Sequence, residues 1–350
     1  MRHGIALVDK QRWQFIQSVF RHLADKSPSH RRDYLDMVCE EDQELRREIE
    51  ALLASHDKLE QGDQDFITPA LITPALQAVN RIQLPQSLGE YRILKELGRG
   101  GMGVVYLAEH PQYDKVALKL LPRFTVEADE AQHRFSLEAR ILSNLDHPGL
   151  SHMFESFTTD EYAAIAMEFI DGKGLDELIK QGPLPFEQGL NIILDLCEVL
   201  HLAHTQGLAH RDIKSNNVLL DRQGQTKLID FGIAKFADTK LTATGQILGT
   251  PSYMSPEQWR GRGVDYRADL WSLGILLFEL LTAQKPFTAA DRFAVANKIL
   301  NKQAPPLPAT SCDGEDLVPV QAILDQLLIK EPQKRLGSCA ELSALLGKLV

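Results

Sequence analysis

The octapeptide HRDIKSNN, residues 210–217, places an aspartate, a lysine and an asparagine close together between the apolar flanks GLA and VLL. Charged side chains are costly to remove from water unless each has a partner. The stretch is therefore either an exposed turn, as most polar octapeptides are, or part of a site whose other members lie elsewhere in the chain. Three further motifs bear on this choice.

The first motif is the glycine-rich stretch GRGGMGVV, in which Gly98, Gly100 and Gly103 have the spacing G-x-G-x-x-G. A turn of glycines, which lack Cβ, can close over phosphate groups and present its N–H groups to them. A dinucleotide-binding fingerprint needs a helix directly after the motif, whereas VVYLAEH is β-branched and aromatic and predicts a strand. A P-loop would end in Gly-Lys-Ser or Gly-Lys-Thr, which this stretch does not. Three glycines also suit any hairpin, so the motif alone is a weak signal.

The other two motifs each end an apolar stretch with a charge. Lys119 ends the predicted strand that contains VALK. A lysine at the end of a strand usually faces solvent. Because this one follows a loop that could cover phosphates, it could also anchor a phosphate. Glu138, in the predicted helix RFSLEARIL, is the carboxylate best placed to hold that lysine. Asp230 in LIDFG is either a turn aspartate or an oxygen ligand for Mg²⁺, which proteins bind through few carboxylates together with substrate phosphates.

The order of these motifs is more specific than any one of them. The glycine-rich loop, the VALK lysine, the helix glutamate, HRDIKSNN, DFG and the SPE of residues 255–257 follow one another as in the protein-kinase signature set. The chain from Tyr91 to about Val350 therefore resembles the eukaryotic-like (Hanks-type) serine/threonine protein kinases. GRGGMGVVYLA and GTPSYMSPEQ are similar to their bacterial branch.

The resemblance implies an α+β, bilobal protein-kinase fold, with a small β-rich N-lobe and a larger helical C-lobe, preceded by a small all-α N-terminal domain. We expect a helical regulatory or docking domain at residues 1–60, a linker at 61–88 and the kinase domain at 89–350. The implied activity is transfer of the γ-phosphate of ATP to Ser/Thr hydroxyls of proteins, with ATP and Mg²⁺ bound.

The resemblance also implies roles for the polar residues. Asp212 accepts or orients the proton of the substrate hydroxyl, Lys214 neutralises the γ-phosphate, and Asn217 holds Mg²⁺ together with Asp230. Lys119 and Glu138 complete the catalytic set. The expected nucleotide-binding residues are Leu97, Gly98, Arg99, Gly100, Gly101, Met102, Gly103, Val104, Val105, Ala117, Lys119, Glu168, Ile170 and Leu219.

Several structural roles carry over in the same way. Met167 precedes the hinge at 168–170, and Thr250 contacts Asp212 and Lys214. The resemblance further implies a stacked spine of Leu142, Met153, His210 and Phe231, a pair between Glu257 and Arg335, and a brace from Asp269 to the catalytic loop. Two departures stand out: Ser215 occupies a structural position where the family often has proline, and the usual ribose-binding acid is not obvious in DGKG.

The elements expected around these residues change in character along the chain. From about Asp9 to Lys58 we expect two to four short helices, with apolar stripes at Trp13, Ile16, Phe20 and Leu23 and at Leu45, Ile49, Leu52 and Leu53. Prolines and a tandem ITPAL indicate a linker next. Strands are predicted within 91–121 and 161–170, with a helix at 130–145 between them, and mostly helices after Gly174.

Composition limits the other possibilities. The net charge of −10 argues against a nucleic-acid-binding surface. Four scattered cysteines lack CxxC spacing, and no apolar stretch is long enough for a membrane span, so we expect a cytoplasmic protein with reduced thiols. Its partners would be protein substrates, with self-association for trans-autophosphorylation at Thr239, Thr242 or Thr244.

Three alternatives stay open. A phosphate among those threonines would pair with Arg211 and order the activation loop at 233–254, or TAT is a small-residue loop tip. The chain could also be a pseudokinase scaffold that binds partners without turnover, although such proteins lose the equivalents of Lys119, Asp212 or Asp230. The helical segment of residues 1–86 could be a protein-interaction module that regulates the kinase.

Overall fold

The computed structural model divides the chain into two units, Met1–Arg81 and Ile82–Val350, and each is considered by itself. The residues that it describes are Val19, Leu23, 28–39, Asp42, 45–47, 49–50, Leu53, 86–100, 103–122, 139–159, 162–229, Phe231, 251–261, 263–289 and 291–350.

The first unit is helical where it is described. Helix α2 (Pro28–Cys39) and helical residues from 45 onward bury one small core, made of Val19, Leu23, Leu35, Cys39, Leu45, Ile49 and Leu53. Asp42 caps the second segment, because its Oδ1 accepts a hydrogen bond from the backbone N–H of Leu45 at 2.9 Å. The predicted stripe residues Leu23, Leu45, Ile49 and Leu53 are in this core, whereas Trp13, Ile16, Phe20 and Leu52 lie outside the described residues.

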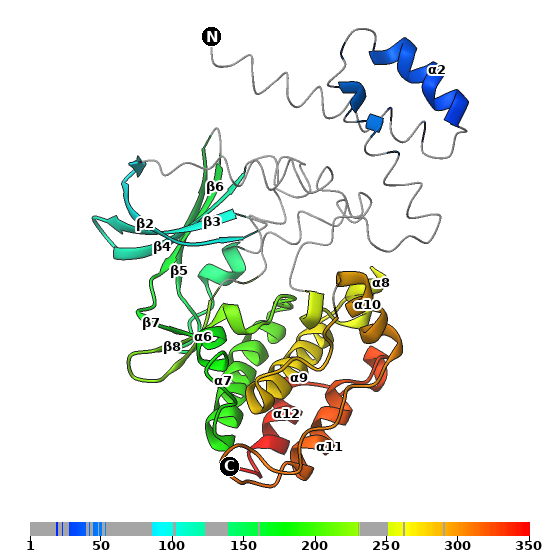
Figure 1. Ribbon diagram of the computed structural model, residues 1–350. Coiled ribbons are helices and arrows are strands. Elements are labelled where there is room, and N and C mark those ends of the chain that lie inside the picture. Colours follow the sequence, from blue (N-terminus) through cyan, green and yellow to red (C-terminus); the bar gives the residue numbers. More distant parts are fainter. Residues whose placement is uncertain are drawn as a thin grey trace. The chain divides into compact units, whose positions relative to one another are not determined.

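The second unit begins with an antiparallel sheet, shown in Figure 1. Its strands are β1 (Ser87–Leu88), β2 (Tyr91–Gly100), β3 (Gly103–His110), β4 (Asp114–Pro122), β5 (Met153–Thr158) and β6 (Tyr162–Glu168), in the order β1-β2-β3-β4-β6-β5. Strand β4 alternates: Val116, Leu118 and Leu120 are fully buried on one face, while Ala117 and Lys119 point to the other. The predicted linker thus ends in two strand residues, Ser87 and Leu88.

A larger helical part follows the sheet. Its helices are α6 (Leu175–Ile179), α7 (Phe186–Thr205), α8 (Pro256–Arg260), α9 (Arg267–Thr282), α10 (Arg292–Asn301), α11 (Val318–Leu327) and α12 (Cys339–Leu346). A small sheet of β7 (Gly172–Gly174), β8 (Val218–Asp221) and β9 (Thr226–Leu228) lies in this part, with short 3-10 turns at Ser215–Asn217, Pro251–Tyr253 and Pro332–Lys334. In the described part of the chain no helix is long and apolar enough to span a membrane.

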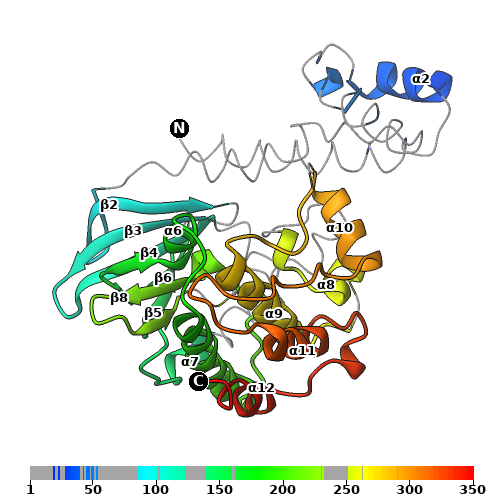
Figure 2. The same ribbon diagram turned by 60° about the horizontal axis from the view of Figure 1, so that its bottom comes forward.

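Helix α9 is the centre of this helical lobe. Every residue from Ala268 to Leu281 is buried, as expected of a helix that is apolar on all sides. It contacts both α7 and α11, and it runs between them in Figures 1 and 2. The few polar side chains of α9, Asp269, Ser272 and Glu279, are therefore buried too. The predicted bilobal α+β architecture is confirmed.

Candidate active site

The catalytic-loop candidate is held by a buried carboxylate of α9. Asp269 has an exposed fraction of 0%. Its Oδ2 accepts hydrogen bonds from the backbone N–H of His210 at 2.8 Å and from His204 Nε2 at 2.9 Å, and its Oδ1 accepts one from the backbone N–H of Arg211 at 2.6 Å. Arg211 has a φ of +60°, an unfavourable conformation for a residue with a Cβ atom. The Asp269 bonds hold the loop in that conformation, which agrees with the predicted brace.

This loop brings the three polar residues of HRDIKSNN together. Lys214 Nζ lies 2.8 Å from Asp212 Oδ2, and Asn217 Nδ2 donates to the backbone oxygen of Asp212 at 2.9 Å. The same amide nitrogen lies 3.4 Å from Asp212 Oδ2. The side chains of Lys214 and Asp212 keep exposed fractions of 19% and 13%, so the pair is accessible at one edge. The loop therefore presents an ion pair, with an amide beside it, at an edge that a substrate can reach.

Three predicted nucleotide residues of the larger sheet, Val105, Ala117 and Lys119, share one of its faces with Met167, whereas Val104 pairs with Leu120 on the other face. Val105 lies opposite Lys119 in the β3–β4 pair, and Ala117 lies opposite Met167 in the β4–β6 pair. Residues directly opposite in antiparallel strands point to the same face, so all four side chains belong to one surface. Lys119 is only 6% exposed, and a buried ammonium requires a partner.

The hairpin of β2 and β3 carries the glycine-rich motif. Gly98 pairs with Val105, Arg99 with Val104 and Gly100 with Gly103, and Leu97 is 40% exposed. The Arg99 guanidinium is held by Glu96 at 2.6 Å, and this bond raises the pKa of Arg99. Gly103 has a packing reason to be glycine: a Cβ atom there would lie 2.2 Å from the backbone oxygen of Leu120.

The hinge candidate is fixed at its first residue. The backbone N–H of Glu168 donates to the His152 oxygen at 2.8 Å, and Ser151 Oγ donates to the Glu168 oxygen at 3.2 Å. The Glu168 carboxylate lies 3.8 Å from Lys227 Nζ on β9. Ile170 is buried two residues further on, and Leu219 lies half-buried on β8 opposite Gly174.

Predicted spine residues lie together. Leu142, Met153 and Phe231 line one small cavity with Met167, and the ring of His210 lies 4.5 Å from that of Phe231. Of the other predicted site residues, Gly101, Met102, Glu138 and Asp230 lie outside the described residues, as do Thr239, Thr242, Thr244 and Thr250. The predicted Lys119–Glu138 pair and the Asp230 ligand therefore stay predictions.

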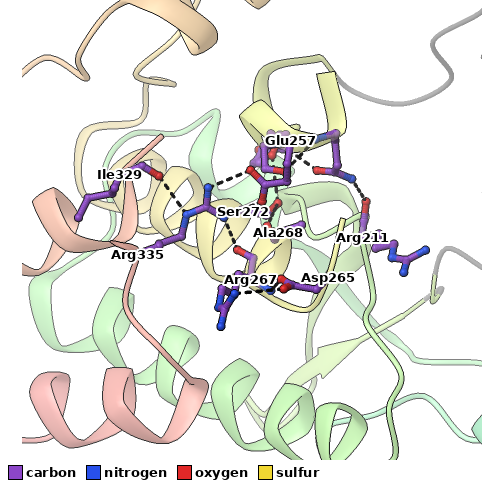
Figure 3. A network of polar contacts seen from close by, with 11 residues as sticks. Arg211, Glu257, Asp265, Arg267, Ala268, Ser272, Ile329 and Arg335 are labelled. Atoms are coloured by element: carbon purple, nitrogen blue, oxygen red, sulfur yellow. Dashed lines mark hydrogen bonds and ion pairs between the residues drawn. The ribbon is translucent and has the colours of Figure 1, made fainter. Parts of the chain in front are cut away.

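A buried ion pair ties α8 to the end of the domain (Figure 3). Arg335 Nη1 lies 2.8 Å from Glu257 Oε1 and Nη2 lies 3.0 Å from Oε2, a bidentate arrangement. The exposed fractions of the Arg335 and Glu257 side chains are 0% and 5%. Arg335 also donates to the backbone oxygens of Arg267 and Ile329. The predicted pairing of Glu257 with Arg335 is present.

Sequence reasoning missed two contacts made by the segment around α8. Gln258 Nε2 donates to the Arg211 oxygen at 3.0 Å, so α8 touches the catalytic loop. Ser255 and Gln258 also form a capping box, and the S-x-x-Q spacing was a readable signal for it. The second contact joins Tyr253 to Ser215 at 2.9 Å, for which the sequence offered no local signal.

Comparison with known proteins agrees with this geometry. The family model "Protein kinase domain" matches residues 91–345, and the chain belongs to the protein kinase family.

Within the family, it is similar to bacterial serine/threonine-protein kinases. It is 37% identical over 259 residues to Pkn1 of Myxococcus xanthus, covering 72% of this chain and 37% of that protein. It is 40% identical over 220 residues to PrkC of Bacillus subtilis, covering 62% and 34%. The chain thus spans little more than a third of the length of these curated relatives. The crystal structure of the Mycobacterium tuberculosis PknI kinase domain matches with a TM-score of 0.60 at 28% identity, covering 77% of this chain and 100% of that domain.

Proposed function

We propose that this protein is a serine/threonine protein kinase that transfers the γ-phosphate of ATP to Ser and Thr hydroxyls of proteins. The observation that carries the proposal is the cluster of Asp212, Lys214 and Asn217 on a loop fixed by the buried Asp269. Membership of the protein kinase family and similarity to relatives named serine/threonine-protein kinases support it.

Each polar residue of the cluster has a task in this reaction. The Asp212 carboxylate, paired with Lys214 at 2.8 Å, accepts the proton of the acceptor hydroxyl or orients that hydroxyl. The Lys214 ammonium has three donors, so it can hold Asp212 and a γ-phosphate oxygen at once. Phosphoryl transfer needs positioning and charge neutralisation more than covalent chemistry, and a loop clamped to a central helix provides positioning.

The nucleotide would lie against the face that carries Val105, Ala117 and Lys119, under the β2–β3 hairpin and beside the hinge at Glu168 and Ile170. Lys119 would hold its phosphates, in a pair with Glu138. Because Arg99 is engaged by Glu96, we assign the phosphate contacts of the hairpin to backbone N–H groups of residues 98–104 rather than to the Arg99 guanidinium.

The donor set also fits Mg²⁺. Asn217 and Asp230 offer an amide oxygen and a carboxylate, both hard ligands of the kind Mg²⁺ takes. The amide nitrogen of Asn217 is bound to the Asp212 carbonyl, which directs the amide oxygen away from Asp212. When bound, the ion would neutralise charge on the phosphates. The partners in this proposal are protein substrates and a second copy of the chain, through autophosphorylation in trans at Thr239, Thr242 or Thr244.

The test compares the full chain with Asp212→Asn in phosphorylation assays with Mg²⁺-ATP and a generic acceptor protein. We expect kcat to fall by about 10²- to 10⁴-fold, the usual contribution of a positioned acid/base group, with little change in the KM for ATP. The exposed Asp146 provides the matched control, Asp146→Asn, which should keep wild-type activity. ATP binding without turnover by the wild type would instead favour a pseudokinase scaffold, and near-wild-type turnover by Asp212→Asn would exclude the role given to Asp212.

A further inference from the structure

A chain of buried polar contacts links the catalytic loop to α9 through a tyrosine. Ser215 Oγ lies 2.9 Å from the Tyr253 hydroxyl, and the Ser215 backbone N–H lies 3.4 Å from the same oxygen. The Tyr253 hydroxyl also contacts Glu279 Oε2 on α9, and Lys285 Nζ lies 3.7 Å from Glu279 Oε1. Ser215, Tyr253 and Glu279 are 2%, 3% and 6% exposed, so water does not substitute for these bonds.

The direction of the hydrogen bonds follows from the donors available. An ionised carboxylate only accepts, and Lys285 favours the ionised form of Glu279 although burial raises its pKa. Burial first, and then the charge of Glu279, raise the pKa of Tyr253, which therefore keeps its proton. Tyr253 has a single proton and gives it to Glu279. Ser215 must then donate with its hydroxyl, and its N–H points to the same acceptor.

The contact between Ser215 and Tyr253 lies next to the proposed catalytic residues in the sequence. Ser215 stands between Lys214 and Asn217, in the 3-10 turn Ser215–Asn217. Tyr253 ends the turn Pro251–Tyr253, which follows Thr250, the residue that the family resemblance implies contacts Asp212 and Lys214. The Tyr253 backbone is fixed separately, because Ser272 Oγ on α9 donates to its oxygen at 3.0 Å. The hydroxyl of Tyr253 thus joins the loop that carries Asp212 and Lys214 to the segment that follows Thr250.

We propose that Ser215 is a positioning residue, which through Tyr253 sets the spacing between the loop of residues 212–217 and the segment 251–253, and thereby the fit of the protein substrate beside Asp212. This rests on the proposed kinase function. Proline, which the family resemblance leads one to expect here, has neither a hydroxyl nor an N–H and could make neither bond. Serine in place of proline at position 215 therefore allows two hydrogen bonds to Tyr253 that proline could not make.

The test is a graded series measured on the full chain. Ser215→Ala removes the hydroxyl, Ser215→Pro removes both donors, Ser215→Thr keeps both, and Tyr253→Phe removes the acceptor. The readouts are kcat and KM for a generic acceptor protein, the KM for ATP, and the Tm of each variant. We expect kcat/KM for the acceptor protein to fall about fivefold or more in Ser215→Ala, the order of one buried hydrogen bond, with the KM for ATP within about twofold of wild type. Ser215→Thr should restore it.

The double variant Ser215→Ala/Tyr253→Phe completes a mutant cycle. Because both changes remove one contact, its loss in kcat/KM should be smaller than the product of the two single losses. If the wild type is active and Ser215→Ala has an unchanged kcat/KM, the role of Ser215 is wrong but the proposed kinase function stands. The same holds if the loss in the double variant equals the product of the two single losses. A wild type inactive on every acceptor overturns the proposed function and this inference with it. If Ser215→Pro lowers the Tm strongly, its loss of activity could come from unfolding. The Ser215→Ala variant and the mutant cycle then test the role of Ser215.

Discussion

Lys330 shows how much a single side chain can depend on its surroundings. Its ammonium lies over two aromatic rings, 4.7 Å from the centre of Trp271 and 4.4 Å from that of Phe287. Its buried Nζ has no hydrogen-bond acceptor within the described part of the chain. Burial first, and then the charges of Arg335 and Arg260, lower the pKa of Lys330 to about 8. The two rings stabilise the cation, but less than burial and the neighbouring charges destabilise it, because the pKa is lowered.

This lowered pKa predicts a pH dependence of stability. Between the folded pKa of about 8 and the ordinary value near 10.5 the unfolded chain binds more protons than the folded one, so the contribution of Lys330 to stability rises with pH in that window. Lys330→Met should remove this increment. Thermal unfolding from pH 7 to 10.5, with the exposed Lys302→Met as control, measures it. Parallel Tm profiles for wild type and Lys330→Met would contradict the prediction.

At the scale of elements, the β2–β3 hairpin contains two glycines, Gly98 and Gly103, that differ in the space available for a side chain. The backbone of β3 at Gly103 lies against that of β4, where a Cβ atom would meet the Leu120 oxygen at 2.2 Å, whereas a Cβ atom at Gly98 meets nothing within 4 Å. Sequence reasoning assigned both glycines to the approach of phosphate. The structure gives Gly103 a second task, the close packing of two strands.

The corresponding prediction compares Gly103→Ala with Gly98→Ala. Overpacking in a close-fitting site costs about 1–3 kcal/mol, so Gly103→Ala should lower the free energy of unfolding by that order. Gly98→Ala should change it far less, because its Cβ atom has room. Denaturant unfolding of both variants measures the difference. Equal losses would show that the strand contact is not what requires glycine at Gly103.

Some of these elements could be predicted from the sequence, and others could not. Helices α7 and α9 and strands β3, β4 and β6 were predictable, because each carries a long local apolar pattern. The apolar stretch before Asp230 predicted a strand where β9 lies. The short strands β7 and β8 were not predicted, since their pairing is set by tertiary contacts. Asp212, Lys214 and Asn217 were found because they lie in one motif. The Ser215–Tyr253 contact joins residues 38 positions apart, and no local pattern encodes it.

At the scale of the whole molecule, each of the two units has its own core. All members of the small core, from Val19 to Leu53, belong to the first unit, and the main core lies in the second, which begins at Ile82. The sheet starts with β1 at Ser87. No residue of the proposed site precedes Leu97.

Deletion of residues 1–86 should therefore leave a folded kinase domain. We expect the truncated chain to unfold in one cooperative transition whose Tm rises with Mg²⁺-ATP, because a ligand that binds only the folded state stabilises it by mass action. Thermal unfolding with and without nucleotide measures this, and the full chain is the control. A truncated chain without a cooperative transition would mean that residues 1–86 are part of the folding unit.

The buried carboxylate of Asp269 has a consequence for motion as well as geometry. Loops that carry function usually open at little cost, and their amide hydrogens exchange rapidly with solvent. Here the amides of His210 and Arg211 are bonded to a side chain at the centre of the helical lobe. Neither amide can reach solvent unless the loop separates from α9, a helix buried from Ala268 to Leu281. We therefore expect amide exchange at these two positions to be slow and to require separation of the loop from α9, so that the backbone before Asp212 is among the best protected in the lobe.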